Sequence, residues 1–438
     1  MRMKKRLFLF LGISILLLAL TAVGFAKSKI EVKMWTFLNP EGKSPREIAL
    51  KEIIENFETD YPDIRISVEP LPFNTIPAKF FASHVAGTAP DIIWMSFREI
   101  GEAVKLGSLA DLNELFIDGW TEEQKEDMSD IFWQYASTPT QRYQITFSRS
   151  ADMLIYRADL FREKGIRTPI TSWKEFIDAA KELTEDIDGD GKIDRWGFGQ
   201  QFGLEKPIGS VFVPSLVELQ GALFSDNGSP AWSTEAGIQS MKLATDLVTR
   251  HKATPDTSVA YSQEDLIQGF AAGKYAMITA AAVRVPTIRT MVTFDPLDVQ
   301  LAHFPSWSGE TFGPGILSGW GVGIWSKSRH KNEAAKFLEY MINEESEHIW
   351  IHTGAQVPFR KSTASKMSDF FEKPENHFLK VMLEAFTQYG WTCPWEFPIS
   401  GYDLDQNRAA QKILIDGKDV ETALTEAENE FMLRHGLK

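Results

Sequence analysis

An acidic loop at residues 186–194 has the residue types and the spacing of a calcium site. The carboxylates at positions one, three, five and nine of an EF-hand-like loop are those of Asp186, Asp188, Asp190 and Asp194. Gly191 stands at position six, where such loops turn sharply, and Lys192 would offer its backbone carbonyl. Position twelve is Gly197 instead of the usual glutamate. We predict a structural Ca²⁺ that takes water or a remote carboxylate at that position; the alternative is an acidic turn without an ion.

The sequence contains none of the common catalytic motifs. There is no nucleophile elbow, P-loop or HExxH motif, and the 8 histidines form no close pair with metal-ligand spacing. A glycoside hydrolase needs only two carboxylates at a defined separation. The 60 acidic residues therefore leave that alternative open. We expect no cofactor for function.

Charge and cysteine content limit the partners of the chain. Its 438 residues include 46 basic and 60 acidic side chains, which gives a net charge of −14. An acidic surface repels phosphate backbones, so nucleic-acid binding is not expected. Cys393 is the only cysteine, which excludes an internal disulfide, a paired-cysteine zinc site and lipid attachment to a cysteine near the N-terminus.

The first 26 residues have the organisation of a secretory signal peptide. Basic residues at positions 2–6 precede an apolar run at 7–23, and small residues flank Phe25. We predict cleavage after Ala26 and a periplasmic or extracellular protein; an uncleaved membrane anchor is the alternative. Cleavage removes four basic and no acidic residues, so the net charge falls from −14 to −18.

Strands and helices alternate along the rest of the chain, which is typical of an α/β protein. Strands are predicted at 29–35, 64–68, 91–95, 153–157 and 275–280, and helices at 44–57, 77–86 and 173–183. Ser44, Pro45 and Glu47 form a capping box at the start of the first helix. From residue 332 onward the pattern is nearly all helical.

Seven segments, in order, resemble family 1 extracellular solute-binding proteins of ABC importers, the group that includes maltose-binding protein. They are VKMWT (32–36), FETDYPDIRI (57–66), GTAPDII (87–93), LIYRADLF (154–161) followed by TSWKEF (171–176), FAAGKYAM (270–277), GWGVG (319–323) followed by NEAAKFL (332–338), and GK (417–418). Each segment alone is weakly specific, but their order covers essentially the whole mature chain.

The resemblance implies a two-lobed periplasmic binding protein fold of type II-like topology, with discontinuous lobes joined by hinge segments. The expected N-terminal lobe is 27–147 plus 307–345, and the C-terminal lobe is 150–304 plus 349–438. The chain is expected to cross between the lobes near 147–152, 304–307 and 344–349. The resemblance also implies a monomer that captures a small-molecule carbohydrate between its lobes, closes by a hinge motion and delivers the ligand to the membrane permease subunits of an ABC transporter.

Sugar sites use aromatic faces for stacking and planar polar groups for paired hydrogen bonds, and such clefts open beyond strand ends. On this basis, and from the correspondence with relatives, the candidate ligand-binding residues are Trp35, Thr36, Asn39, Ser96, Arg98, Arg149, Ser150, Arg284, Gly319, Trp320, Trp391, Trp395, Glu396, Asp403 and Arg408. Relatives often carry an aromatic residue where this chain has Arg284, so this position departs from the family and makes the pocket tolerant of anions.

The identity of the ligand stays open at this point. The 13 tryptophans favour an oligosaccharide, followed by a monosaccharide or a polyol. If Arg98, Arg149 and Arg284 converge, an acidic sugar or a sugar phosphate is favoured, because guanidinium groups match carboxylate and phosphate oxygens. An exported glycoside hydrolase and a purely structural scaffold are the alternatives from other classes.

Overall fold

Strands and helices alternate along the first part of the chain, as the sequence predicts. Strand β1 (Ile30–Thr36) leads through helix α2 (Pro45–Asp60) to strand β2 (Ile64–Pro70), which pairs with β1 in parallel. The Ser44 amide donates to the Glu47 carboxylate at 3.0 Å, so the predicted capping box at the start of α2 is confirmed. Strand–helix–strand units of this kind build a sheet with helices on its faces.

The computed structural model describes residues 29–97, 99–134, 140–204, 210–394, 396 and 401–437. Within these residues, 9 strands form one mixed sheet in the order β2-β1-β3-β8-β4-β6-β5, with β7 beside β4 and β9 beside β8. The strands not yet given are β3 (Ile92–Ser96), β4 (Ile145–Arg157), β5 (Trp196–Gly199), β6 (Tyr275–Ala281), β7 (Val299–Ala302), β8 (Gly315–Ile324) and β9 (Gly390–Trp391).

Two long strands join the two parts of the sheet. The first part of β4 pairs with β8 from Ile145 to Asp152, and its second part pairs with β6 and β7 from Asp152 to Arg157. Strand β8 also pairs with β3 on its other side. The sheet is therefore continuous from β2 to β5 through β4 and β8.

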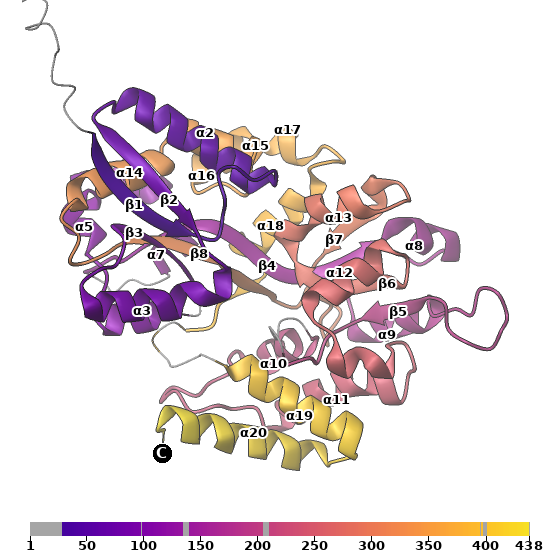
Figure 1. The fold of residues 1–438 in the computed structure, drawn as a ribbon. Helices are drawn as coiled ribbons and strands as arrows, with labels where there is room; N and C mark the ends of the chain where they lie inside the picture. The colour runs from indigo at the N-terminus through magenta and orange to yellow at the C-terminus, as the bar shows by residue number, and fades with distance from the viewer. Residues whose placement is uncertain are drawn as a thin grey trace, which may run out of the picture.

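Helices cover both parts of the sheet (Figure 1). In chain order, those not yet given are α3 (Ile76–Ala86), α4 (Ile100–Lys105), α5 (Leu112–Leu115), α6 (Glu122–Asp127), α7 (Asp130–Gln134), α8 (Ala158–Lys164), α9 (Trp173–Glu182), α10 (Phe212–Gln220), α11 (Glu235–Thr249), α12 (Gln263–Ala271), α13 (Val285–Met291), α14 (Lys331–Met341), α15 (Glu344–His352), α16 (Lys361–Lys366), α17 (Ser368–Phe371), α18 (His377–Thr387), α19 (Tyr402–Asp416) and α20 (Val420–His435). None of the helices in this part of the chain has the length and apolar character that a membrane span requires.

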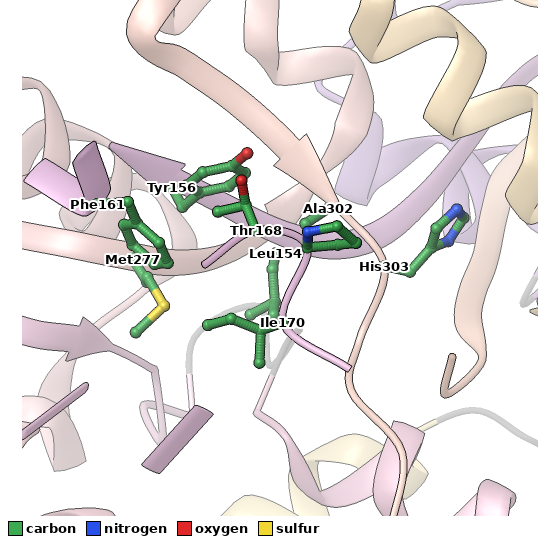
Figure 2. A pocket seen from close by; sticks show the side chains of 9 residues that line it. Leu154, Tyr156, Phe161, Thr168, Ile170, Met277, Ala302 and His303 are labelled. Carbon is green, nitrogen blue, oxygen red and sulfur yellow. The ribbon is translucent and has the colours of Figure 1, made fainter. Parts of the chain in front are cut away.

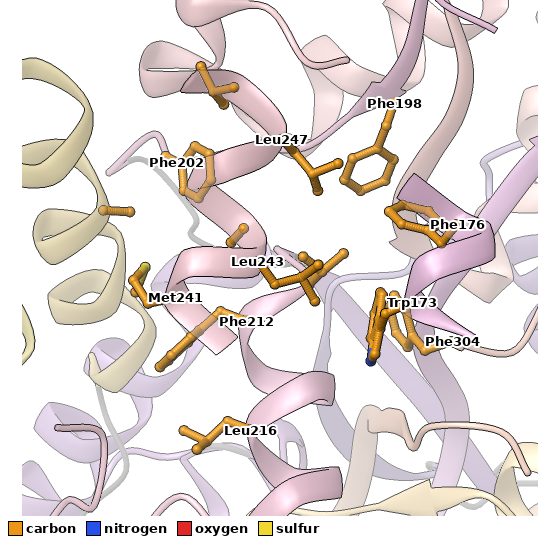
Figure 3. Close-up of a cluster of buried hydrophobic side chains, with 14 of the residues drawn as sticks. Trp173, Phe176, Phe198, Phe202, Phe212, Leu216, Met241, Leu243, Leu247 and Phe304 are labelled. Carbon is orange, nitrogen blue, oxygen red and sulfur yellow. The ribbon is translucent and has the colours of Figure 1, made fainter. Parts of the chain in front are cut away.

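The hydrophobic cores divide the molecule into two lobes. In the first lobe, α2 and α14 pack on one face of β1–β3, and α3 packs on the other. In the second lobe, one core lies among α9, α10, α11, α19 and α20, and its aromatic side chains include Trp173, Phe176 and Phe198 (Figure 3). The other core of this lobe lies among β6, α12, α13 and α18. This is the predicted two-lobed α/β fold.

The segments that were expected to cross between the lobes lie in different kinds of structure. Residues 147–152 are in the middle of β4, residues 304–307 follow β7, and residues 344–349 begin α15. The lobe boundaries drawn from the resemblance stay predictions. The predicted strand at 153–157 is correct in position but too short, since β4 begins at Ile145.

Candidate functional site

An aromatic pair lies where β8 passes between the lobes. Trp320 is opposite Ser96 of β3 and opposite Ser148 of β4 in the strand register. Its indole ring lies 4.6 Å from the ring of Phe37, centroid to centroid, at an interplanar angle of 44°. Both rings are partly exposed. Partly exposed aromatic rings of this kind can stack on the apolar face of a ligand.

The backbone that carries Trp320 requires the preceding glycine. Gly319 has φ 154°, and a Cβ atom there would lie 2.2 Å from the carbonyl oxygen of Ser148. The Phe97 amide donates to the Gly319 carbonyl at 3.1 Å. Only glycine allows this close approach of β8 to β4, so the position of the indole depends on it.

Arg46 reaches this pair from the first turn of α2. Its Nη1 donates to Ser148 Oγ at 3.2 Å, and its guanidinium carbon lies 5.3 Å from the centroid of the Phe37 ring. The side chain is partly exposed. Desolvation, followed by repulsion from Arg284, lowers the pKa of Arg46 to about 10. Arg46 therefore stays charged at neutral pH but lies near another cation.

Arg284 approaches the same region from the second lobe. Its Nη2 donates to both carboxylate oxygens of Glu264, at 3.1 and 2.8 Å. The neighbouring Val283 amide donates to Ser150 Oγ at 3.4 Å. Ser148 and Ser150 are two residues apart on β4, and such side chains share one face of a strand. We call Phe37, Arg46, Ser148, Ser150, Arg284 and Trp320 the junction cluster.

Three of its six members, namely Ser150, Arg284 and Trp320, were predicted from the sequence. Phe37, Arg46 and Ser148 were not predicted. Phe37 directly follows Trp35 and Thr36, which were predicted as ligand-binding residues. The expectation that ligand contacts follow the first strand therefore indicated the correct segment. Arg46 and Ser148 are 102 positions apart, and no sequence signal joins them.

Arg149 is held by internal partners instead of facing the junction cluster. It is 1% exposed, and its Nη1 and Nε donate to the carbonyls of Pro358 and Thr146 at 2.7 and 3.2 Å. Burial lowers its pKa to about 10, although Glu347 acts in the opposite direction. These contacts favour a structural role, and they differ from the expectation that Arg149 converges with Arg284 on a ligand.

The candidates after the first strand also have partners within their own lobe. Trp35 is 8% exposed and its Nε1 donates to Glu69 at 2.6 Å, while the Lys79 ammonium lies 4.1 Å from the indole. Thr36 is fully buried and accepts from the Leu38 amide. The exposed Asn39 caps a turn by accepting from the amide two residues further on.

The remaining candidates are spread over the molecule. Ser96 lies beside Trp320, and its hydroxyl donates to the Glu99 carboxylate. Trp391 pairs with Ile316 of β8 and packs on the core of the second lobe. The carbonyl of Glu396 accepts from Lys105 of α4 at 2.5 Å. Arg98 and Trp395 lie outside the residues that the structure describes.

Asp403 and Arg408 belong to the first half of α19, which runs beside α20 in the second lobe (Figure 1). The Asp403 carboxylate accepts from the Leu404 amide at 2.9 Å. Arg408 is 3.4 Å from Asp405, a fully buried carboxylate that also pairs with Arg434 of α20. Arg408 therefore contacts the carboxylate that joins α19 to α20.

In the acidic loop, three of the five predicted ligands converge. Carboxylate oxygens of Asp186, Asp188 and Asp194 lie within 4.8 Å of one another, and all three residues are exposed. Asp190 is oriented differently, since it accepts from the Lys192 amide at 2.8 Å and lies 3.4 Å from the Lys192 ammonium. Three carboxylates at this spacing suit a hard cation.

The clearest cavities lie away from the junction cluster. One, enclosed by Tyr156, Phe161, Met277 and their neighbours in the second lobe, has a volume of about 20 Å³ (Figure 2). It is too small for a sugar, because a single water already needs about 10–15 Å³ by this measure. A larger groove of about 780 Å³ runs beside Trp120, Asp127 and Arg360 in the first lobe.

A two-lobed α/β fold with aromatic and polar side chains at the lobe junction fits a solute-binding protein. The profile of the bacterial extracellular solute-binding proteins matches residues 43–348, and the chain belongs to this family. Membership in a family of extracellular solute-binding proteins implies an exported protein.

Individual relatives are similar at low identity. A binding protein from Brucella abortus is 24% identical over 320 residues, which are 72% of this chain and 73% of the relative. An ABC substrate-binding protein from Listeria monocytogenes, solved with cycloalternan, has a TM-score of 0.76 at 22% identity and matches 94% of this chain and 100% of its own. UgpB from Mycobacterium tuberculosis, solved with glycerophosphocholine, has a TM-score of 0.76 at 19% identity and matches 92% of this chain and 98% of its own. At these identities the two structures show the shared fold.

Proposed function

We propose that this protein captures a carbohydrate between its two lobes, outside the cytoplasmic membrane, and delivers it to the permease of an ABC importer. The observation that carries this proposal is the partly exposed pair of Phe37 and Trp320, with the Arg46 guanidinium beside Phe37. Aromatic faces and planar polar groups in one place complement the C–H faces and the hydroxyls of a sugar. Both rings also pack against the core of the first lobe.

The family narrows the activity to transport, and the junction cluster supports a polyhydroxylated ligand. The Listeria relative was solved with an oligosaccharide, cycloalternan, and the Mycobacterium relative with a phosphate-bearing compound. Both ligand classes are compatible with the cluster, because it combines two aromatic rings with two guanidinium groups. The two ligands share hydroxyl groups, and we take a carbohydrate as the first candidate among hydroxylated solutes.

Calorimetry and thermal-shift measurements on the purified mature protein test the proposal. Maltotriose, glucose, ribitol and glucose 1-phosphate are suitable probes, since a ligand that binds only the folded state raises Tm according to its affinity. Binding without turnover of at least one carbohydrate is the expected result. Hydrolysis of an oligosaccharide during the measurement would support the glycosidase alternative, and no binding of any carbohydrate would contradict the proposal.

Export is part of the proposal. The signal peptide predicted at 1–26 lies outside the described residues, and its cleavage after Ala26 would leave a mature chain that begins at Lys27. The mass of the protein recovered from its native host reports the cleavage site directly. A mass that includes the first 26 residues would favour the anchor. Gel filtration at several concentrations tests the expected monomer.

A further inference from the structure

Arg149 lies beside an irregular point in the pairing of β4 with β8. The register of the two strands shifts between Thr146 and Ser148, and Arg149 is opposite Gly319 just beyond the shift. Its Nε donates to the carbonyl of Thr146, on the other side of the shift, at 3.2 Å. One side chain therefore bridges the irregular point of the strand that runs from the first lobe into the second (Figure 1).

The guanidinium of Arg149 also contacts the cores of both lobes. Its carbon is 5.1 Å from the ring centroid of Phe359, a buried residue of the first-lobe core. It is 5.9 Å from the ring centroid of Phe386, which packs against the second-lobe core. Both distances lie within the range of a cation–π contact. The guanidinium thus has one aromatic partner in each lobe.

The segment between α15 and α16 supplies further partners of Arg149. Its Nη1 donates to the carbonyl of Pro358 at 2.7 Å, and its amide donates to Gln356 Oε1 at 3.2 Å. The residue is 1% exposed, and within the described part of the chain no ion pair joins it to a carboxylate. An apolar side chain would avoid the cost of burying this charge, so the charge is explained better by what it joins than by a contribution to folding.

We infer that Arg149 is a positioning residue that sets the angle between the two lobes, and thereby the equilibrium of closure around the ligand. A register shift interrupts the regular ladder of a strand pair, so the angle at this point depends on side-chain contacts. Arg149 joins the irregular point of β4 to both cores. This inference rests on the proposed function, the capture of a ligand between the lobes, and adds a residue that controls it.

A residue of this kind affects all ligands by the same factor. Without the contacts of Arg149 the lobes take a wider range of orientations, and the fraction of molecules that can close on a ligand falls. The apparent Kd of every ligand then rises in inverse proportion to that fraction, whatever the chemistry of the ligand. A residue that touches the ligand changes the affinities for different ligands by different factors.

Calorimetry and small-angle X-ray scattering on the purified mature protein test the inference. Arg149→Met replaces the guanidinium by an unbranched apolar side chain. With maltotriose, glucose, ribitol and glucose 1-phosphate as probes, it should raise every measurable Kd by one common factor of about threefold or more. The radius of gyration of the ligand-free protein should rise as well. Arg149→Lys should show smaller changes in both quantities, because an ammonium group can still contact the two rings.

Two further variants separate positioning from stability. Glu428→Gln is the matched control, since Glu428 of α20 accepts from the Ser233 amide and hydroxyl, at 2.8 and 2.6 Å, within the second lobe. It should lower Tm and leave the Kd values and the radius of gyration unchanged. Phe386→Leu removes the ring of the second lobe and should act like Arg149→Met, but more weakly. If Arg149→Met does not fold, Phe386→Leu and Arg149→Lys decide.

The outcomes separate this inference from the proposed function. Kd values that change by different factors, or not at all, would overturn the inference and leave the capture of a carbohydrate standing. A radius of gyration that neither Arg149→Met nor Phe386→Leu changes would also overturn it. If the wild type binds none of the probes, the proposed function is contradicted, and the radius of gyration alone decides the role of Arg149.

Discussion

Glu347 of α15 and Arg360 form an ion pair at 3.0 Å in which the carboxylate is completely buried and the guanidinium is partly exposed. The same carboxylate accepts from the amides of Phe359 and Arg360, at 2.5 and 2.9 Å, and from the Thr363 hydroxyl at 2.7 Å. It thus fixes the segment that supplies the carbonyl of Pro358 to Arg149. This network lies directly behind the strand that carries Ser148.

Replacement of this carboxylate should destabilise the protein strongly. Glu347→Gln removes a buried charge that satisfies four donors, and we expect a loss of about 3 kcal/mol in the free energy of unfolding. Urea denaturation of the ligand-free protein measures it. Glu344→Gln is the matched control, because Glu344 is 64% exposed and pairs with Lys366 at the surface; its cost should stay below about 1 kcal/mol. Equal effects of the two substitutions would show that the buried network contributes little.

Removal of the indole at the junction should weaken ligand binding more than it affects folding. Trp320→Ala deletes one ring of the pair with Phe37, and aromatic contacts of this kind contribute about 0.5–1.5 kcal/mol. We therefore expect a roughly threefold to tenfold loss of affinity for a carbohydrate ligand, measured by calorimetry. Trp120→Ala, in the groove of the first lobe and also partly exposed, should leave the affinity unchanged. Equal losses in both variants would argue against Trp320 as a ligand contact.

Calcium should stabilise the second lobe through the acidic loop. With Ca²⁺ at one hundred times its Kd, the free energy of unfolding should rise by about 2.7 kcal/mol, and a chelator should reverse the rise in Tm. Asp194→Asn should remove this response, because Asp194 belongs to the three convergent carboxylates. Asp226→Asn, an exposed acid outside the loop, should retain it. A melting curve that neither Ca²⁺ nor the chelator changes would contradict the predicted site.

Stability should fall as the pH decreases from 7 to 5, in part through His303. Burial lowers the pKa of His303, while the Glu384 carboxylate, 3.1 Å from its Nε2, acts in the opposite direction. Its Nδ1 is buried without a partner. Because the pKa is lower in the folded state than in the unfolded state, near 6.5, the unfolded state binds more protons between the two values. The contribution of His303 to the free energy of unfolding is therefore complete above about pH 6.5, and it is lost as the pH falls through the pKa of His303 in the folded state.

Substitution of this histidine isolates its share of the pH dependence. His303→Gln should make the decrease in unfolding free energy between pH 7 and 5 smaller than in the wild type, as measured by urea denaturation at both pH values. His377→Gln, at an exposed position on α18, should behave like the wild type. An unchanged pH profile in the His303 variant would assign the dependence to other groups.

Local patterns in the sequence predicted most of the first lobe correctly. The strands β1, β2 and β3 and the helices α2 and α3 follow from alternating or helical apolar spacing, and these predictions are confirmed. The first half of β4 was missed, although its apolar residues alternate with polar ones from Ile145 to Met153 and only Arg149 breaks the alternation. These polar side chains are nevertheless buried. Arg149 is accommodated by a carbonyl that follows it by 209 residues, and sequence spacing cannot reveal such a partner.

The site could be predicted only in part, for the same reason. Glycine-rich sequence at 319–323 drew attention to Trp320, and its position at the junction follows from the pairing of β8 with β3 and β4. Arg46 gave no such signal, since an arginine in the first turn of a capped helix usually faces solvent. Its contact with Ser148 depends on how α2 meets β4, which is a property of the whole fold.

The register shift in β4 between Thr146 and Ser148 and the glycine conformation at Gly319 in β8 lie side by side, because Arg149 is opposite Gly319. The pairing of β4 with β8 is thus irregular at this position of the sheet, and the two strands are paired on both sides of it. A rotation of the lobes, expected from the resemblance to binding proteins that close around a ligand, would therefore bend the sheet most easily at this position.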